Sequence, residues 1–277
     1  MYTTQSGTGD IFTLIMDVKS CSFKRAINYC IDHTNLKVSN LTVTLPFNGF
    51  FKNIKKGASR EKVVNTTYEE EDLPSNKLIS KRFIDDNISA QTQEKWGVRY
   101  DGLTNSILIP IRNENGDLVG CKARVNESDC PTSKRWWAFL KYSKTHFVYG
   151  LYENYRDIIN NHRLYVFESE KSVLQCDSFG VNNAVAIGGN SLSSEQVRLI
   201  KSMLCKEIVV AFDEGLDEEQ VIYEVNKLKM NNIAICNKVG YIWDDDNSIL
   251  EKGSKNSPSD LGLREFNKLS KEKIKWM

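Results

Sequence analysis

Histidine is scarce in this sequence and cysteine is scattered through it. The 277 residues contain three His and seven Cys, and no two Cys form a C-x-x-C pair. Zinc sites and disulfide frameworks need clustered Cys or His, so neither is expected, and three distant His do not suggest a Ser/His/Asp or Cys/His nucleophile. Such cysteines are typical of reduced, mostly buried side chains in a cytoplasmic protein.

Long apolar runs and an excess of charge are also missing. The sequence has no run of ~18 apolar residues, so no transmembrane helix is expected. The N-terminus lacks the apolar segment of a signal peptide. Lys and Arg total 37 against 36 Asp and Glu. Overall charge therefore does not indicate a nucleic-acid-binding protein, and such a function must rest on local basic patches. We expect no membrane partner, and roughly two domains of ~100–200 residues each.

Apolar runs and helical patterns alternate after residue 160. Strands are expected at 164–167, 184–187, 207–212 and 233–235. Helices are expected between them, from 170 to about 176, from 193 to 204 and from 217 to 230. This alternation predicts an α/β fold with a mostly parallel sheet and helices on both faces.

Two of these strands end on a carboxylate, Glu168 and Asp213. Carboxyl ends of parallel strands meet at one edge of a sheet, where open α/β folds place their chemistry. Clustered carboxylates there suit Mg²⁺, which takes one or two of them together with substrate phosphates. An acid at a strand end can instead begin the following helix. We favour that reading for 217–219 and a functional role for Glu168 with Asp213.

Basic and aromatic residues are interleaved earlier in the chain. A strand at 106–111 and a return strand at 118–125 flank the turn 113–116, where Asn-Gly tolerates positive φ. Lys122 and Arg124 alternate with apolar residues and so face one side. The segments 134–137 and 141–144 add further Lys, Arg, Trp and Tyr side chains. Such a surface suits a single-stranded nucleic acid, because the cations bind phosphates and the aromatic rings stack on bases. The alternative, in which the tryptophans lie in the core and the lysines are solvated, stays open.

The order of these segments resembles the DnaG-type primases. Residues 164–262 resemble a Toprim domain, the metal-binding fold that these primases share with topoisomerases. The segments that carry the likeness in the Toprim part are Val166-Phe167-Glu168-Ser169, Ala184-Val185-Ala186-Ile187-Gly188-Gly189, Val210-Ala211-Phe212-Asp213 and Lys255-Asn256-Ser257-Pro258-Ser259-Asp260. Upstream, 105–124 resembles the basic part of the primase RNA-polymerase domain, 147–152 its connection to Toprim, and 9–26 the end of the zinc-binding domain.

This resemblance implies a Toprim-like, mostly parallel sheet flanked by helices and preceded by a mixed α+β basic subdomain. The implied divisions are a helical remnant of the zinc-binding domain (1–40), a linker with short elements (41–85), the basic subdomain (86–160) and the Toprim domain (161–277). The degree of divergence suggests a phage or mobile-element member. Thr3, Thr4 and Ser6 stand where zinc-binding cysteines are expected, so no zinc is expected.

The family's acids carry over only in part. Its first-strand glutamate, which acts on metal and proton transfer, corresponds to Glu168. The first acid of its D-x-D pair corresponds to Asp213, while Gly215 takes the second position and Ser172 takes that of another acid. Glu214 or Asp217 could substitute, and the late acidic motif survives as Asn256, Ser259 and Asp260. The predicted catalytic residues are Glu168 and Asp213, and the predicted ligands of Mg²⁺ or Mn²⁺ are Glu168, Asp213, Asp217 and Asp260.

Basic residues carry over better. The residues predicted to bind nucleic acid or nucleotide are Arg112, Lys122, Arg124, Lys134, Arg135, Lys141, Lys144 and Lys171. The implied function is metal-dependent RNA primer synthesis on single-stranded DNA from nucleoside triphosphates, with a replicative helicase as a further partner. Two alternatives stay open: a catalytically degenerate Toprim module that binds single-stranded DNA or a replication partner, and a Toprim-type nuclease.

Overall fold

The computed structural model describes residues 2–4, 7–9, 11–20, 26, 29–30, 66–127, 130–131, 134–230 and 237–277. The chain divides into two compact units, 1–63 and 64–277. The expected strand at 233–235 and much of the expected helical remnant at 1–40 lie outside the described residues. Within the described part, no helix is both long enough and apolar enough to cross a membrane.

The first unit is described only near its start. Strand β1 (Tyr2–Thr4) pairs antiparallel with β2 (Gly7–Gly9), and helix α1 (Ile11–Lys19) follows. This helix lies within the segment 1–40, where a helical remnant was expected. Thr3 and Thr4, at two of the expected zinc-ligand positions, lie in β1, and Ser6 lies outside the described residues.

The first sheet of the second unit is antiparallel and has the order β3-β4-β5-β6. Its strands are β3 (Arg99–Asp101), β4 (Ser106–Arg112), β5 (Leu118–Val125) and β6 (Trp136–Leu140). Short helices precede it: η1 (Glu70–Asp72), α4 (Lys81–Asp85) and α5 (Ala90–Lys95). The expected hairpin around Asn113–Gly116 is confirmed, since β4 and β5 pair directly.

The stretch from residue 66 to 85, expected in a linker with short elements, packs against this antiparallel sheet. The Tyr68 backbone N–H donates to the Leu118 carbonyl, and the buried side chains of Leu73 and Phe83 join its cores. The described part of the linker is thus built into the second unit. The boundaries expected at 86 and 161 stay predictions.

A second sheet of order β11-β10-β9-β7-β8 follows. Its strands are β7 (Arg163–Phe167), β8 (Ala184–Ala186), β9 (Glu207–Ala211), β10 (Lys238–Ile242) and β11 (Ile274–Trp276). All pairs are parallel except β10 with β11. The helices are η3 (Lys144–His146), α6 (Tyr155–Asn161), α7 (Glu170–Ser178), α8 (Ser194–Ser202), α9 (Glu218–Leu228) and α10 (Leu263–Glu272). The predicted α/β class and mostly parallel sheet are confirmed.

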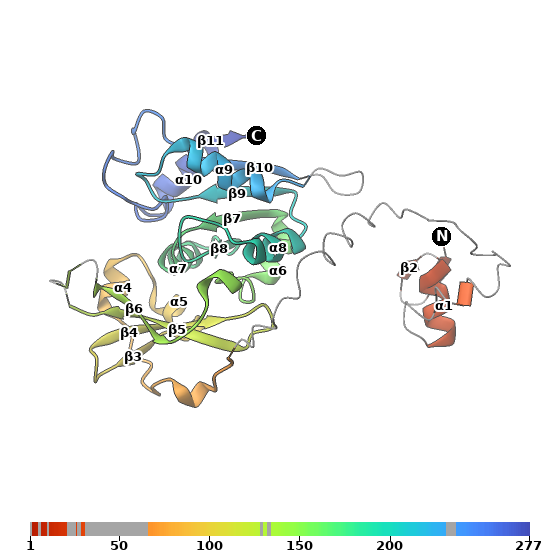
Figure 1. Cartoon of the computed structure of the whole chain (residues 1–277), viewed down its shortest axis with the longest axis horizontal. Helices are drawn as coiled ribbons and strands as arrows, with labels where there is room; N and C mark the ends of the chain where they lie inside the picture. The colour runs from red at the N-terminus through yellow and green to blue at the C-terminus, as the bar shows by residue number, and fades with distance from the viewer. Residues whose placement is uncertain are drawn as a thin grey trace. The chain divides into compact units, whose positions relative to one another are not determined.

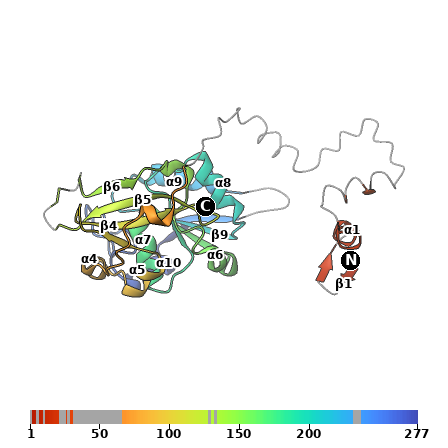
Figure 2. The same cartoon turned by 90° about the horizontal axis from the view of Figure 1, so that it is seen from below.

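Alternate residues of this sheet enter two different cores. Leu164 and Val166 face the core under α6, α8 and α9. Tyr165 and Phe167 face the other side, against α7 and α10, in a core that continues into β4 of the antiparallel sheet. Figure 1 shows α7 and α5 between the two sheets, and Figure 2 shows the antiparallel sheet from below. One shared core therefore fixes the basic strands relative to the carboxyl edge of β7 and β9.

Candidate functional site

Glu168 and Asp213 lie side by side at the carboxyl edge of the parallel sheet. Phe167 at the end of β7 pairs with Ala211 at the end of β9, so the residues that follow leave the sheet together. The Asp213 backbone N–H donates a hydrogen bond to Glu168 Oε1 over 3.0 Å. The predicted proximity of the two acids is confirmed.

The pKa of each of these two carboxyl groups is raised above its ordinary value. Burial, together with the nearby charges of Glu168 and Asp260, raises the pKa of Asp213 to about 7, while Lys171 and the Ser257 hydroxyl act in the opposite direction. Burial also raises the pKa of Glu168, against the hydrogen bond from the Asp213 backbone. Asp213 Oδ1 is buried without a hydrogen-bond partner. An unpartnered carboxylate oxygen beside a second carboxylate fits a hard divalent cation.

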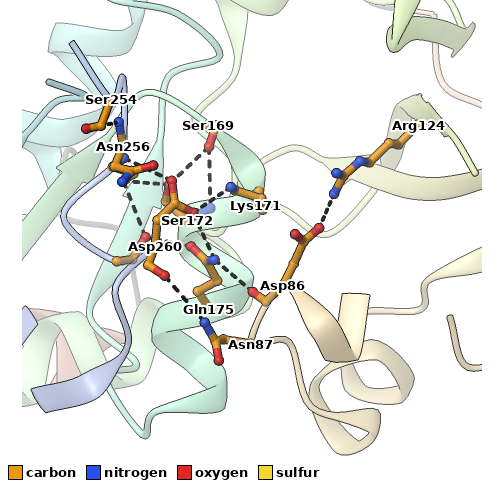
Figure 3. A network of polar contacts seen from close by, with 12 residues as sticks. Asp86, Asn87, Arg124, Ser169, Lys171, Ser172, Gln175, Ser254, Asn256 and Asp260 are labelled. Atoms are coloured by element: carbon orange, nitrogen blue, oxygen red, sulfur yellow. Dashed lines mark hydrogen bonds and ion pairs between the residues drawn. The ribbon is translucent and has the colours of Figure 1, made fainter. Parts of the chain in front are cut away.

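Asp260 approaches the same edge but is already partnered. Lys171 Nζ lies 2.5 Å from Asp260 Oδ1, and the same oxygen accepts from Gln175 Nε2 over 3.0 Å. Asp260 Oδ2 accepts from the Ser257 backbone N–H over 3.0 Å. Figure 3 shows Lys171 and Gln175 directed at this carboxylate. Asp260 is thus near Asp213, as expected, and held by three donors.

The acids after β9 are arranged differently from one another. Asp217 is exposed at the start of α9 and makes no capping hydrogen bond; with Asp213 it lines a cavity of about 330 Å³. Glu214 accepts from the backbone N–H groups of Gly253 and Lys255 over 3.0 and 3.1 Å, which ties it to the loop before Asp260. Among the described residues, no group of three or more His, Cys, Asp or Glu is arranged to hold a metal ion. The donor set that fits a cation is the pair Glu168 and Asp213.

The basic face of β5 is paired internally. Lys122 Nζ lies 2.5 Å from Glu170 Oε2, at the start of α7, and Arg124 forms an ion pair with Asp86. The Trp136 ring packs under both cations, with its centroid 4.9 Å from Lys122 Nζ and 5.4 Å from the Arg124 guanidinium carbon. The prediction that Lys122 and Arg124 face the same side is confirmed. Trp136 is neither a core residue nor free, since it serves as the platform of these two cations.

The other predicted binding residues surround this face. Arg112 ends β4 and pairs with Glu70. Lys134, Lys141 and Lys144 are exposed and Arg135 is half-buried; Lys144 Nζ donates to the Gly188 carbonyl over 3.4 Å. Their binding roles stay predictions, and so does the metal-binding role of Asp217.

Sequence reasoning missed the residues that connect the parts of the site. Glu170, 3% exposed, joins α7 to the basic face, and its position two residues after Glu168 was a usable signal. Gln175 and Ser257 hold Asp260. Asp86, the partner of Arg124, carries no local signal, because its role depends on packing between segments 38 residues apart.

The sequence of this chain is similar to those of several DNA primases. No family model matches the sequence. The chain is similar to the DNA primase of Halalkalibacterium halodurans, with 26% identity over 207 residues, which are 72% of this chain and 34% of that protein. It is also similar to the DNA primase of Buchnera aphidicola, with 24% identity over 160 residues, which are 56% of this chain and 28% of that protein. The matched part is thus about a third of each relative.

Solved primase structures share the fold. The Aquifex aeolicus primase, in a crystal structure of its zinc-binding and RNA-polymerase domains, aligns with 97% of this chain and 71% of its own, with a TM-score of 0.57 and 16% identity. A DnaG primase catalytic domain bound to single-stranded DNA aligns with 70% of this chain and 71% of its own, with a TM-score of 0.53 and 16% identity. In its sequence matches and in the fold of its second unit, this chain is similar to the DnaG-type DNA primases.

Proposed function

We propose that this chain synthesises RNA primers on single-stranded DNA during replication, as a nucleotidyltransferase of the cytoplasm. The observation that carries the proposal is the pairing of Glu168 with Asp213 at the carboxyl edge, on the same rigid core as the basic face of β5. The Lys122–Glu170 ion pair connects these two parts directly. A reaction site and a template surface are thus held in fixed relation, which positions reactants before the chemical step.

The template would lie along the basic and aromatic residues of β5 and β6. Trp137 is exposed, and the ring next to it in space, Phe139, is 5.8 Å away between centroids. Lys134, Lys141 and Lys144 supply exposed charge around these rings. Stacking on rings with cations on the phosphates recognises single strands with little sequence preference, and the similar DnaG catalytic domain is one bound to single-stranded DNA.

Glu168 and Asp213 would hold Mg²⁺ or Mn²⁺. When bound, such an ion supplies positive charge that offsets the nucleoside triphosphate and lowers the pKa of an attacking hydroxyl. The chain's own contribution is to present two carboxylates whose charges are held together by the fold, and to exclude water from Asp213 Oδ1. A replicative helicase is a further proposed partner.

Primer synthesis on a single-stranded template with labelled ribonucleoside triphosphates tests the proposal. Glu168→Gln keeps the shape and the hydrogen-bond acceptor for the Asp213 N–H but removes the charge, so we expect at least a hundredfold loss of product. Glu219→Gln, on the exposed side of α9, is the matched control and should retain wild-type synthesis. Equal synthesis by Glu168→Gln and wild type would rule out the site.

A binding module without catalysis is the second candidate. It is favoured by the pairing of Asp260 with Lys171 and by Gly215, which stands where the family resemblance leads one to expect a second aspartate. This candidate predicts that the wild-type chain binds single-stranded DNA but makes no primer at any Mg²⁺ or Mn²⁺ concentration. Cleavage of the same template in place of primer synthesis would instead identify the nuclease alternative.

A further inference from the structure

Lys171 places a fixed positive charge inside the carboxylate cluster. It lies in the first turn of α7, and its Nζ contacts Asp260 Oδ1 at 2.5 Å. The side chains of Lys171 and Asp260 are only 24% and 18% exposed. The charge of Lys171 acts on Asp213 as well as on Asp260. It is therefore a part of this edge, in contrast to the exposed Lys134 and Lys141 on either side of β6.

Asp260 already accepts from three donors. Besides Lys171, it accepts from the Gln175 side chain and from the Ser257 backbone. Gln175 is itself held by Ser259, whose hydroxyl donates to Gln175 Oε1 over 2.7 Å. A metal ion would have to displace the lysine from Asp260, whose own hydrogen bonds are charge-assisted and among the stronger ones in proteins.

The neighbouring serines form a network of neutral hydroxyl groups beside Lys171 and Asp260. Ser169 caps α7 and contacts the Ser172 hydroxyl at 3.0 Å, and Ser172 donates to Ser257 over 2.9 Å. Figure 3 shows the Ser169 and Ser172 side chains beside Lys171 and Asp260. Neutral hydroxyls thus stand where the family resemblance leads one to expect an acid at position 172. Such a network supports a lysine, and it offers a second divalent ion no free carboxylate.

Charge balance points the same way. Glu168, Asp213 and Asp260 carry three negative charges, and Lys171 cancels one. The remaining two charges match one divalent ion, and those two carboxylates are the number that Mg²⁺ needs alongside substrate phosphates. The Glu214 carboxylate already accepts hydrogen bonds from the backbone of residues 253 and 255. The space beside Gly215 is open, since a Cβ there would have no neighbouring atom within 4 Å.

We propose that Lys171 is a built-in cation of this site, so that the chain binds one divalent ion, at Glu168 and Asp213, with Asp260 as the positioning residue of Lys171. The proposal deepens the proposed function and rests on it for the identity of the ion. It also assigns Lys171 a place in the carboxylate edge in addition to any contact with nucleotide phosphate.

Titration of the full chain with Mn²⁺, in the absence of nucleotide, tests this assignment. Calorimetry measures the binding, and electron paramagnetic resonance measures the Mn²⁺ that remains free. Wild type should bind one ion. Lys171→Gln frees the Asp260 carboxylate, so it should bind a second ion or bind the first at least fivefold more tightly. Lys171→Arg keeps the charge and should behave as wild type. Lys171→Gln with Asp260→Asn should bind one ion, and near-ultraviolet circular dichroism checks that each variant is folded.

Two ions in wild type, or a Lys171→Gln titration identical to wild type in number and affinity, would overturn the assignment of Lys171. Absence of Mn²⁺ binding in every folded variant would overturn it as well, together with the metal site. Failure of the proposed function has a different signature: one ion bound as expected, with no primer synthesised by the wild-type chain.

Discussion

The backbone N–H of Asp213 donates to the carboxylate of Glu168, 3.0 Å away, so that the end of β9 holds the acid that follows β7. This bond directs the Glu168 side chain across the sheet edge toward Asp213. Burial raises the pKa of both acids, and the nearby charge of Glu168 raises the pKa of Asp213 further. The fold therefore maintains a repulsive pair, as expected of a site that stabilises a cation or a transferring phosphoryl group.

Asp213 should make the chain less stable as the pH rises. Its pKa in the folded chain, about 7, exceeds the ordinary value of 3.8, so the folded state binds more protons than the unfolded state between these values. The free energy of unfolding then falls as the pH rises from about 4 to about 7. Asp213→Asn removes the charge and should stabilise the chain by ~2 kcal/mol at pH 8, and by little at pH 4.

Urea denaturation in the presence of EDTA measures this effect, with Asp217→Asn, which changes an exposed acid, as the control. The control should be neutral at both pH values. A stabilisation by Asp213→Asn of the same size at pH 4 and pH 8 would mean that the charge of Asp213 is not its cause. Added Mg²⁺ should stabilise wild type and leave Asp213→Asn unchanged.

Local patterns were sufficient to predict the hairpin of β4 and β5, the strands β7, β8 and β9, and the acidic edge. Apolar runs predicted β7 and β9, and because these two strands are adjacent and parallel, Glu168 and Asp213 come together. The Asn-Gly turn predicted the hairpin of β4 and β5 in the same way. Each of these relations depends on residues close in sequence or on one strand pairing.

The partners of the charged residues could not be predicted in this way. Lys122 meets Glu170 across 48 positions, and Arg124 meets Asp86 across 38. These contacts depend on how the antiparallel sheet packs on α7, which no periodicity encodes. The same holds for Lys171, whose partner Asp260 arrives from the loop before α10, so a lysine expected to bind nucleotide proves to be held by a carboxylate expected to bind metal.

Lys122 and Glu170 should contribute to the free energy of unfolding in a strongly non-additive way. The Glu170 side chain is 4% exposed and that of Lys122 22%, so Lys122→Met would leave a buried carboxylate without its partner and should destabilise the chain by ~3 kcal/mol. Lys122→Met combined with Glu170→Gln removes both charges and should recover more than half of that loss. Urea denaturation of the four proteins of this double-mutant cycle measures the coupling, and additive single effects would contradict it.

Gln196 should stabilise the junction between η3 and the parallel sheet. Its buried side-chain amide lies 3.0 Å from the Phe147 carbonyl and 2.8 Å from the Ile187 carbonyl. Gln196→Ala leaves these buried acceptors without their donor and should cost ~2 kcal/mol in the free energy of unfolding. Gln220→Ala, on the exposed side of α9, is the matched control and should change stability by less than ~0.5 kcal/mol. Equal stability of the two variants would show that these contacts are not maintained in solution.

Trp137 should contribute to binding of single-stranded DNA more than to stability. Its side chain is 37% exposed, and a base stacked on an aromatic ring is worth ~1–3 kcal/mol. Trp137→Ala should therefore weaken binding by ~5- to 100-fold at constant salt, with little change in the urea midpoint. Trp136→Ala should weaken binding and also lower stability, because Trp136 packs under Lys122 and Arg124.

Fluorescence anisotropy with a labelled oligonucleotide at two salt concentrations measures these affinities. Trp137→Ala should leave the dependence of affinity on salt unchanged, because no phosphate contact is lost. Lys141→Ala should instead reduce that dependence. Tyr223→Ala removes a 65% exposed aromatic ring from α9 and is the matched control. If Tyr223→Ala and Trp137→Ala have the same affinity, the face formed by β5 and β6 is not where the single strand binds.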